Sequence, residues 1–203
     1  MRIKFTKFTK KNLKKNQMSS KKTHPWLIWV DCEMTGLNPQ TEKILEIAVV
    51  ITDENLDVMA EMPSLVIHHK MERLEQMDEW NRSHHAASGL WQKSMESAIT
   101  IENAEEQILV FLEKNLLQGE FANMRPPLAG NSVGQDKAFL DLEMPKLMEK
   151  LHYRIIDVSS IKEMALRWYP QIEAFEKAEK HRALDDIHES INELKYFRQL
   201  IFK

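Results

Sequence analysis

The sequence places two carboxylates where they could bind a cation. Asp31 and Glu33 come directly after a continuous apolar run, Trp26–Val30, which predicts a buried strand. Because successive side chains of a strand alternate between its faces, the two carboxylates project from one face, about 6–7 Å apart along the strand. Carboxylates in that position are costly to bury unless they are paired or bind a metal. The alternative is a loop that begins at Asp31 and leaves both groups in water.

Further carboxylates and a histidine occur in two later segments. Asp136 follows a polar turn and falls in the first turn of a predicted helix, and Asp186 comes five residues after His181. At 100° per residue, Asp186 borders the apolar face of the helix predicted at Ala183–Leu200, whereas Asp185 points to water. Taken singly, Asp136 is also explained as an acid favoured by the helix dipole, and His181 as a surface histidine.

Together these residues favour a metal-dependent phosphoryl reaction. Carboxylate oxygens without thiolates are the ligands that Mg²⁺ and Mn²⁺ prefer. Two such ions about 3.5–4 Å apart can activate a water and stabilise the leaving oxygen of a phosphate ester. A neutral histidine beside that water could remove its proton. The predicted site therefore combines four carboxylates and one histidine: Asp31, Glu33, Asp136, Asp186 and His181.

The elements that must position these residues follow from the spacing of apolar residues. The close spacing of the first three predicted strands favours an antiparallel meander, and shorter strands alternate with helices after it. We therefore predict an α/β fold: a mixed sheet, three antiparallel strands plus parallel strands, flanked by helices. The predicted strands are 26–30, 44–52, 58–68, 128–129 and 154–157, and helical pattern covers 71–118, 135–151 with a break near Pro145, 159–168 and 183–200.

Charge is divided unevenly along the 203-residue chain. Residues 1–24 contain nine Lys or Arg and no acid, so the net charge of −3 leaves about −12 for residues 25–203. We expect a disordered basic tail over 1–24 and one domain over 25–203. An acidic domain does not attract long nucleic acids by charge alone. If it acts on phosphates, cations must bridge the repulsion.

Cysteine content and hydropathy exclude several other classes of protein. The single cysteine, Cys32, excludes an internal disulfide framework and a multi-cysteine zinc site, and we expect it to be buried in the core. One unpaired cysteine favours a reducing, intracellular setting, and we expect a cytoplasmic protein. No apolar run approaches the roughly 18 residues of a membrane span, so we expect no membrane association.

Four motifs occur in an order that is typical of one family of nucleases. They are DCEMTGL from Asp31, WN…H…SGL from Trp80, GNSVGQD from Gly130 and HRALDDI from His181. In this order they resemble the oligoribonuclease family, a branch of the DEDDh exonucleases with a ribonuclease H-like fold. The similarity runs from about Trp26 to Leu200. It implies a 3′→5′ exoribonuclease that degrades very short RNA, chiefly dinucleotides, to 5′-mononucleotides.

The resemblance also implies roles for individual residues. The metal ligands of the family fall on the four carboxylates named above, and its general base falls on His181. Leu37 would wedge between bases, Trp80 and His85 would line the dinucleotide pocket, and the spacing to Ser88 selects His85 over His84. The implied cofactors are two divalent cations per site, Mg²⁺ or Mn²⁺.

A second group of residues implied by the resemblance concerns the 5′ phosphate and the partner subunit. Ser132 would contact the phosphate, Arg154 and Ser159 of the partner subunit would cap it, and Tyr153 would lie at the active site. These assignments imply a homodimer whose other partner is short RNA.

Three other interpretations remain open at this point. Ser132 within GNSVG, followed by Asp157 and His181, has the chain order of a serine hydrolase, although too few strands precede it for that fold. A DEDDh exonuclease that acts on longer RNA or DNA would carry the same ligands. A dinucleotide-binding or scaffold protein without activity would be favoured if a ligand were missing, but each of the five positions holds the required residue.

Overall fold

The fold is built on one mixed sheet. The computed structural model describes residues 24–116, 123–176 and 182–202. Five strands lie in the order β3-β2-β1-β4-β5. β1 pairs antiparallel with β2, and β2 with β3, whereas the β1–β4 and β4–β5 pairs are parallel. The predicted mixed α/β architecture is confirmed. The strands are β1 (Leu27–Met34), β2 (Ile44–Thr52), β3 (Val58–Val66), β4 (Pro127–Gly130) and β5 (His152–Asp157).

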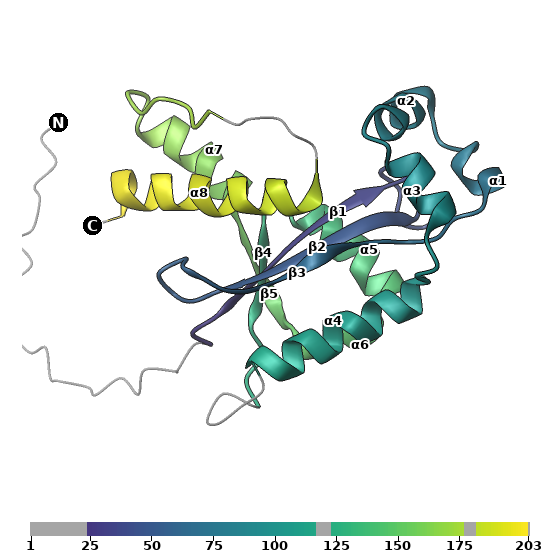
Figure 1. Ribbon diagram of the computed structural model, residues 1–203. Helices are drawn as coiled ribbons and strands as arrows, with labels where there is room; N and C mark the ends of the chain where they lie inside the picture. The colour runs from purple at the N-terminus through teal and green to yellow at the C-terminus, as the bar shows by residue number, and fades with distance from the viewer. Residues whose placement is uncertain (1–23, 117–122, 177–181, 203) are drawn as a thin grey trace, which may run out of the picture.

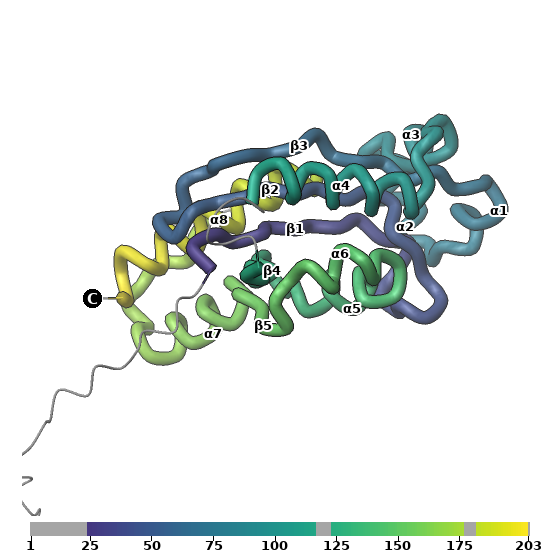
Figure 2. Tube along the Cα trace, turned by 90° about the horizontal axis from the view of Figure 1, so that it is seen from below, coloured from purple at the N-terminus to yellow at the C-terminus, as the bar shows by residue number. Residues whose placement is uncertain are grey.

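Helices cover both faces of this sheet. In Figure 1, α7 and α8 lie above the strands and α4 and α6 lie below them, while α1–α3 gather beyond the end of β1. Figure 2 shows the same layers from below, with α4 in front of the strands and α8 behind them. The helices are α1 (Met71–Leu74), α2 (Glu79–Ala87), α3 (Leu90–Glu96), α4 (Ile101–Leu116), α5 (Gly134–Glu143), α6 (Pro145–Lys150), α7 (Val158–Trp168) and α8 (Ala183–Ile201).

The alternation of side chains along β1 decides which face each residue joins. Ile28, Val30 and Cys32 pack in the core beneath α4–α6, and the buried position expected for Cys32 is confirmed. Trp29 packs in the core on the opposite face, against α8. Because Asp31 is two residues after Trp29, it continues on the α8 face.

Several element boundaries differ from the prediction. β1 continues to Met34, because its pairing with β2 extends past both carboxylates. The helical pattern over 71–118 is divided among α1–α4: Asp78 caps α2 by accepting the amide of Asn81, and Gly89 has a left-handed φ of 72° before α3. The predicted tail lies outside the described residues except for His24. Within the described ranges, no helix is long and apolar enough to cross a membrane.

Candidate active site

Three carboxylates meet where the second half of β1 faces the start of α8. One carboxylate oxygen each from Asp31, Glu33 and Asp186 lie within 4.8 Å of one another, and all three side chains are half-buried. Strand alternation aims Asp31 and Glu33 at the same face, and the first turn of α8 brings Asp186 over them. Asp185 is also half-buried rather than fully exposed, but it is not part of this group.

Asp136 reaches the site from another direction. It lies in the first turn of α5 and is 6% exposed. Its Oδ1 accepts a hydrogen bond from the backbone amide of Cys32 at 2.9 Å, so it is tied to β1 between the two strand carboxylates. Its oxygens are outside the group of three, but its charge is close enough to raise the pKa of Asp31.

Burial and mutual repulsion weaken the acidity of these carboxyl groups. Burial, followed by the charges of Asp136, Asp186 and Glu33, raises the pKa of Asp31 well above its usual value. The pKa of Glu33 rises to about 7, chiefly through burial and then through Asp186 and Glu46. Burial raises the pKa of Asp136 to about 6, against the hydrogen bond from Cys32. Bound cations would relieve this repulsion, and an all-oxygen donor set fits Mg²⁺ or Mn²⁺.

A half-buried ion pair that the sequence pattern did not predict lies beside the carboxylates. Glu46 of β2 pairs across the strands with Glu33 and is fully buried. Nη2 of Arg182 lies 3.2 Å from Oε1 of Glu46, and the carbonyl of Arg182 accepts the amide of Asp186 at 2.9 Å. The signal was present: a charged residue within an otherwise apolar strand requires a partner. The predicted base, His181, precedes Arg182 and lies outside the described residues.

Two large apolar side chains are exposed near the end of β1. Leu37 is 79% exposed in the loop that follows the strand, and Trp80 of α2 is 69% exposed. The Trp80 ring stacks on His84, with ring centroids 4.9 Å apart and planes 6° from parallel. His85 is only 2% exposed, and its Nε2 lies 2.9 Å from the carbonyl oxygen of Met34. His85 is therefore buried behind the end of β1, where it contacts Met34. His84, which the motif spacing did not select, stacks on the exposed indole of Trp80.

The turn between β4 and α5 holds Ser132 in a left-handed conformation, with a φ of 50°. Its amide donates to Asp157 Oδ1 at 2.9 Å and to Ser159 Oγ at 3.0 Å, and the two serine hydroxyls are 3.1 Å apart. The resemblance implied that Ser159 comes from a partner subunit. Here Ser159 contacts Ser132 of its own chain, because β5 pairs with β4 and α7 starts beside the turn.

Asp157 is fully engaged by backbone and hydroxyl donors. Its Oδ1 accepts the amides of Ser132 and Ser159, and its Oδ2 accepts the hydroxyl of Ser160 at 2.9 Å. The carboxylate therefore caps α7 and holds the Ser132 turn. It is not available to orient a catalytic histidine, which argues against the serine hydrolase interpretation.

Tyr153 and Arg154 lie away from the carboxylates of their own chain. Both are exposed on β5, an edge strand, and Tyr153 is 73% exposed. The guanidinium carbon of Arg154 lies 5.4 Å from the centroid of the Tyr153 ring. Tyr153 is four residues before Asp157, about 13 Å along a strand. The structure does not bring either side chain to the site.

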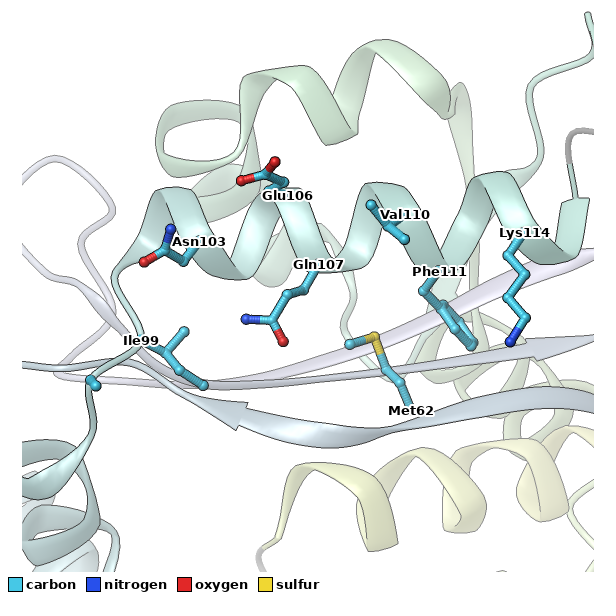
Figure 3. A pocket seen from close by; sticks show the side chains of 9 residues that line it. Met62, Ile99, Asn103, Glu106, Gln107, Val110, Phe111 and Lys114 are labelled. Atoms are coloured by element: carbon cyan, nitrogen blue, oxygen red, sulfur yellow. The ribbon is translucent and has the colours of Figure 1, made fainter.

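An open groove of about 670 Å³ lies between β3 and α4, lined by apolar residues such as Met62, Ile99 and Phe111 (Figure 3). These side chains pack against the core on the α4–α6 face of the sheet. Asp31 faces the other side, so the groove is separate from the carboxylates.

Comparisons with known proteins agree with this geometry. An exonuclease family profile matches residues 28–194. Oligoribonuclease of Marinobacter nauticus is 51% identical over 87% of this chain and 96% of its own. The mitochondrial oligoribonuclease of Homo sapiens is 49% identical over 87% of this chain and 73% of its own.

Solved structures show the same fold at much lower identity. Exonuclease I from Methylocaldum szegediense superposes with a TM-score of 0.66 at 15% identity, over 88% of this chain and 41% of its own. The nuclease domain of 3′hExo, a DEDDh family member bound to rAMP, gives 0.60 at 14% identity, over 88% and 94%. The family profile and the relatives near 50% identity together establish that this chain belongs to the oligoribonuclease family of exonucleases.

Proposed function

We propose that this chain is a 3′→5′ exoribonuclease that hydrolyses short oligoribonucleotides, chiefly dinucleotides, to 5′-mononucleotides. The observation that carries the proposal is the convergence of Asp31, Glu33 and Asp186 within 4.8 Å, in a chain about half identical to oligoribonucleases. Half-buried carboxylates repel one another, and such a cluster is typical of a site that binds cations, which in turn bind a phosphate.

The proposed cofactors are two divalent cations per site, Mg²⁺ or Mn²⁺. Asp31, Glu33, Asp136 and Asp186 would hold them. When bound, the cations would supply the positive charge that activates a water and stabilises the leaving 3′ oxygen. The protein holds the four ligands in fixed positions: β1 carries two of them, and α5 and α8 carry one each.

His181 is proposed as the general base that removes a proton from the attacking water. Its neighbour Arg182 is anchored to the buried Glu46, and Asp186 follows four residues after Arg182, in the first turn of α8. A base at this place in the chain would therefore be attached to a fixed point beside the carboxylates. A neutral imidazole is the form that accepts the proton.

Exposed apolar side chains and the turn at Ser132 would bind the dinucleotide. Leu37 and Trp80 offer exposed apolar surfaces for bases, and stacking on an aromatic ring tolerates every base. His85, which contacts the carbonyl of Met34, would support the end of β1 from inside the fold. The hydroxyls of Ser132, just before α5, and Ser159, in the first turn of α7, are 3.1 Å apart and are suited to the 5′ phosphate.

The full pocket is proposed to form in a homodimer. Tyr153 and Arg154 stand exposed on an edge strand, too far along β5 to reach their own site, so a role at the site would require a second copy. An arginine from that copy would close the pocket beyond the 5′ phosphate and bind it in a forked geometry. We place the enzyme in the cytoplasm, in keeping with its single, buried cysteine.

Digestion of 5′-labelled RNAs of two to twenty nucleotides with Mg²⁺ tests the substrate. We expect the highest kcat/KM on the dinucleotide and a steep fall with length. A DEDDh exonuclease for longer RNA or DNA would instead prefer the longer substrates, and that result would overturn the proposed specificity.

A further inference from the structure

The loop Thr35–Lys43 joins β1 to β2 and carries Leu37 near its tip. Its ends are bonded together: the Thr35 amide donates to the Lys43 carbonyl at 2.8 Å, and the Lys43 amide donates to Thr35 Oγ1 at 2.9 Å. Inside the loop, the carbonyl of Asn38 accepts the amide of Glu42 at 2.8 Å. The backbone is thus held in one shape, although the Leu37 side chain is 79% exposed.

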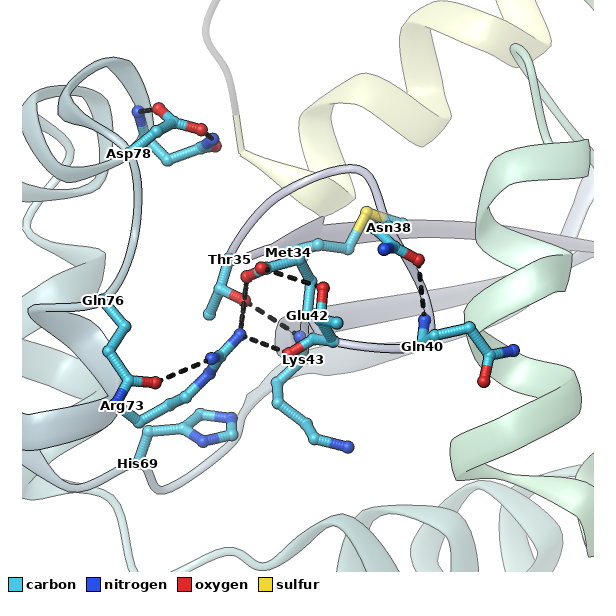
Figure 4. Close-up of polar contacts among 12 residues, drawn as sticks. Met34, Thr35, Asn38, Gln40, Glu42, Lys43, His69, Arg73, Gln76 and Asp78 are labelled. Carbon is cyan, nitrogen blue, oxygen red and sulfur yellow. Dashed lines mark hydrogen bonds and ion pairs between the residues drawn. The ribbon is translucent and has the colours of Figure 1, made fainter.

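Arg73 of α1 closes over this loop from outside. Its Nη2 donates to Thr35 Oγ1 and to the Thr41 carbonyl, both at 2.8 Å, and to Glu42 Oε2 at 2.5 Å, as Figure 4 shows for Thr35 and Glu42. The Thr35 hydroxyl also donates to Glu42 Oε2. The Arg73 and Glu42 side chains are only 23% and 22% exposed, so water screens this ion pair less than a surface pair.

Glu42 reaches Thr35 and Arg73 because the residue beneath it has no side chain. A Cβ on Gly36 would lie 2.9 Å from Cγ of Glu42, closer than real contacts allow. The glycine next to Leu37 therefore makes room for the carboxylate that binds Arg73. We call Arg73, Glu42 and Thr35 the loop clasp.

The loop is held at two further points by α5, the helix that carries Asp136. Nε2 of Gln135 donates to the carbonyl of Leu37 at 2.5 Å. At the other end, Nζ of Lys43 lies 2.5 Å from Oε1 of Glu143. Leu37 is therefore fixed relative to Gln135, the residue that precedes Asp136, and the clasp adds a link from the loop to α1.

We propose that Arg73 is a positioning residue for substrate binding: through the loop clasp it sets the place of the exposed Leu37 side chain, and so the fit of the dinucleotide. This inference rests on the proposed function, in which Leu37 and Trp80 contact bases. The hydrogen bonds of Arg73 to the loop go to Thr35, Thr41 and Glu42, and not to the active-site carboxylates. Loosening the clasp should weaken substrate binding and leave the carboxylate frame on β1 and α8 in place.

The test compares Arg73→Met with wild type on a 5′-phosphorylated dinucleotide with Mg²⁺. We expect KM to rise about tenfold and kcat to stay within about twofold, because the ligands of the cations are unchanged. Arg73→Lys keeps a charged donor and should stay within about threefold of the wild-type KM. The matched control is Arg198→Met, which removes an exposed arginine whose bond to Asn55 is 3.5 Å long, and it should change neither constant.

Hydrogen exchange measures the loop independently of catalysis. In Arg73→Met, amides in 35–43 should exchange about tenfold faster, whereas amides of β2 should exchange as in wild type. Unchanged exchange in 35–43, or faster exchange with an unchanged KM, would overturn the inference. An equal loss of kcat and kcat/KM would also contradict it, since that pattern indicates damage to the reacting centre. Wild-type protein that cleaves no short RNA would instead refute the proposed function itself.

Discussion

Without divalent cations, raising the pH should destabilise the folded protein, and Glu33 should account for a large share of the effect. Folding raises the pKa of Glu33 from 4.5 to about 7, mainly through burial. The folded state therefore holds this proton more tightly than the unfolded state does. Stability from this group is complete below pH 4.5 and is lost as the pH rises towards 7.

The size of the effect follows from the change in pKa. At 1.36 kcal/mol per pKa unit, moving the pKa from 4.5 to about 7 corresponds to about 3 kcal/mol lost above pH 7. In a chain of this length, 1 kcal/mol changes Tm by about 2–4 °C. Glu33→Gln keeps the size of the side chain and removes the charge. In EDTA at pH 8 we expect this variant to melt up to about 10 °C above wild type.

The assay is thermal unfolding at pH 5 and pH 8, in EDTA and in Mn²⁺, with exposed Glu54→Gln as the control. In Mn²⁺ the order of wild type and Glu33→Gln should reverse, because only wild type has the complete set of ligands and gains stability from binding. Parallel pH dependence of Tm in wild type and Glu33→Gln without metal would refute the electrostatic reasoning.

Three further changes should separate the roles of residues at the site. His181→Ala should lower kcat by about 10²–10⁴-fold with Mn²⁺ affinity kept, as measured by calorimetry, and a near-normal rate would remove His181 from the mechanism. Asp186→Asn should abolish measurable turnover while Asp185→Asn costs less than about tenfold, because only Asp186 joins the carboxylate group; the reverse ranking in a kinetic assay would contradict this geometry. Arg182→Met should lower the free energy of unfolding in urea by about 2 kcal/mol, since it leaves Glu46 buried and unpaired, and adding Glu46→Gln should recover most of that loss.

Local periodicity was enough to predict which face of its strand or helix each site residue occupies. A period of two predicted that Asp31 and Glu33 share a face and that Cys32 points into the core, because this depends only on the strand itself. A period of 3.6 favoured Asp186 over Asp185 for the carboxylate group, but Asp185 is half-buried and does not simply point to water. The strand argument needs no knowledge of neighbouring elements, so the shared face of Asp31 and Glu33 held even though β1 continues four residues beyond the predicted end.

Contacts between distant segments could not be read from spacing. Arg182 and Glu46 are 136 positions apart, and Arg73 and Thr35 are 38 apart. Nothing in a local pattern says which arginine meets which carboxylate, because the pairing depends on how α8 and α1 pack against the sheet. The same limit explains Ser159, whose place beside Ser132 of its own chain follows from the β4–β5 pairing.

The central claim is that this carboxylate site hydrolyses the phosphodiester of a short RNA with the help of divalent cations. The most direct test is mass spectrometry of a 5′-phosphorylated diribonucleotide digested in ¹⁸O-water, with Mg²⁺ or with excess EDTA. We expect rapid cleavage with Mg²⁺, one ¹⁸O in the 5′ phosphate of the nucleotide released from the 3′ end, and no cleavage in EDTA or by Asp31→Asn. Cleavage that persists in EDTA, or ¹⁸O absent from that phosphate, would contradict the account.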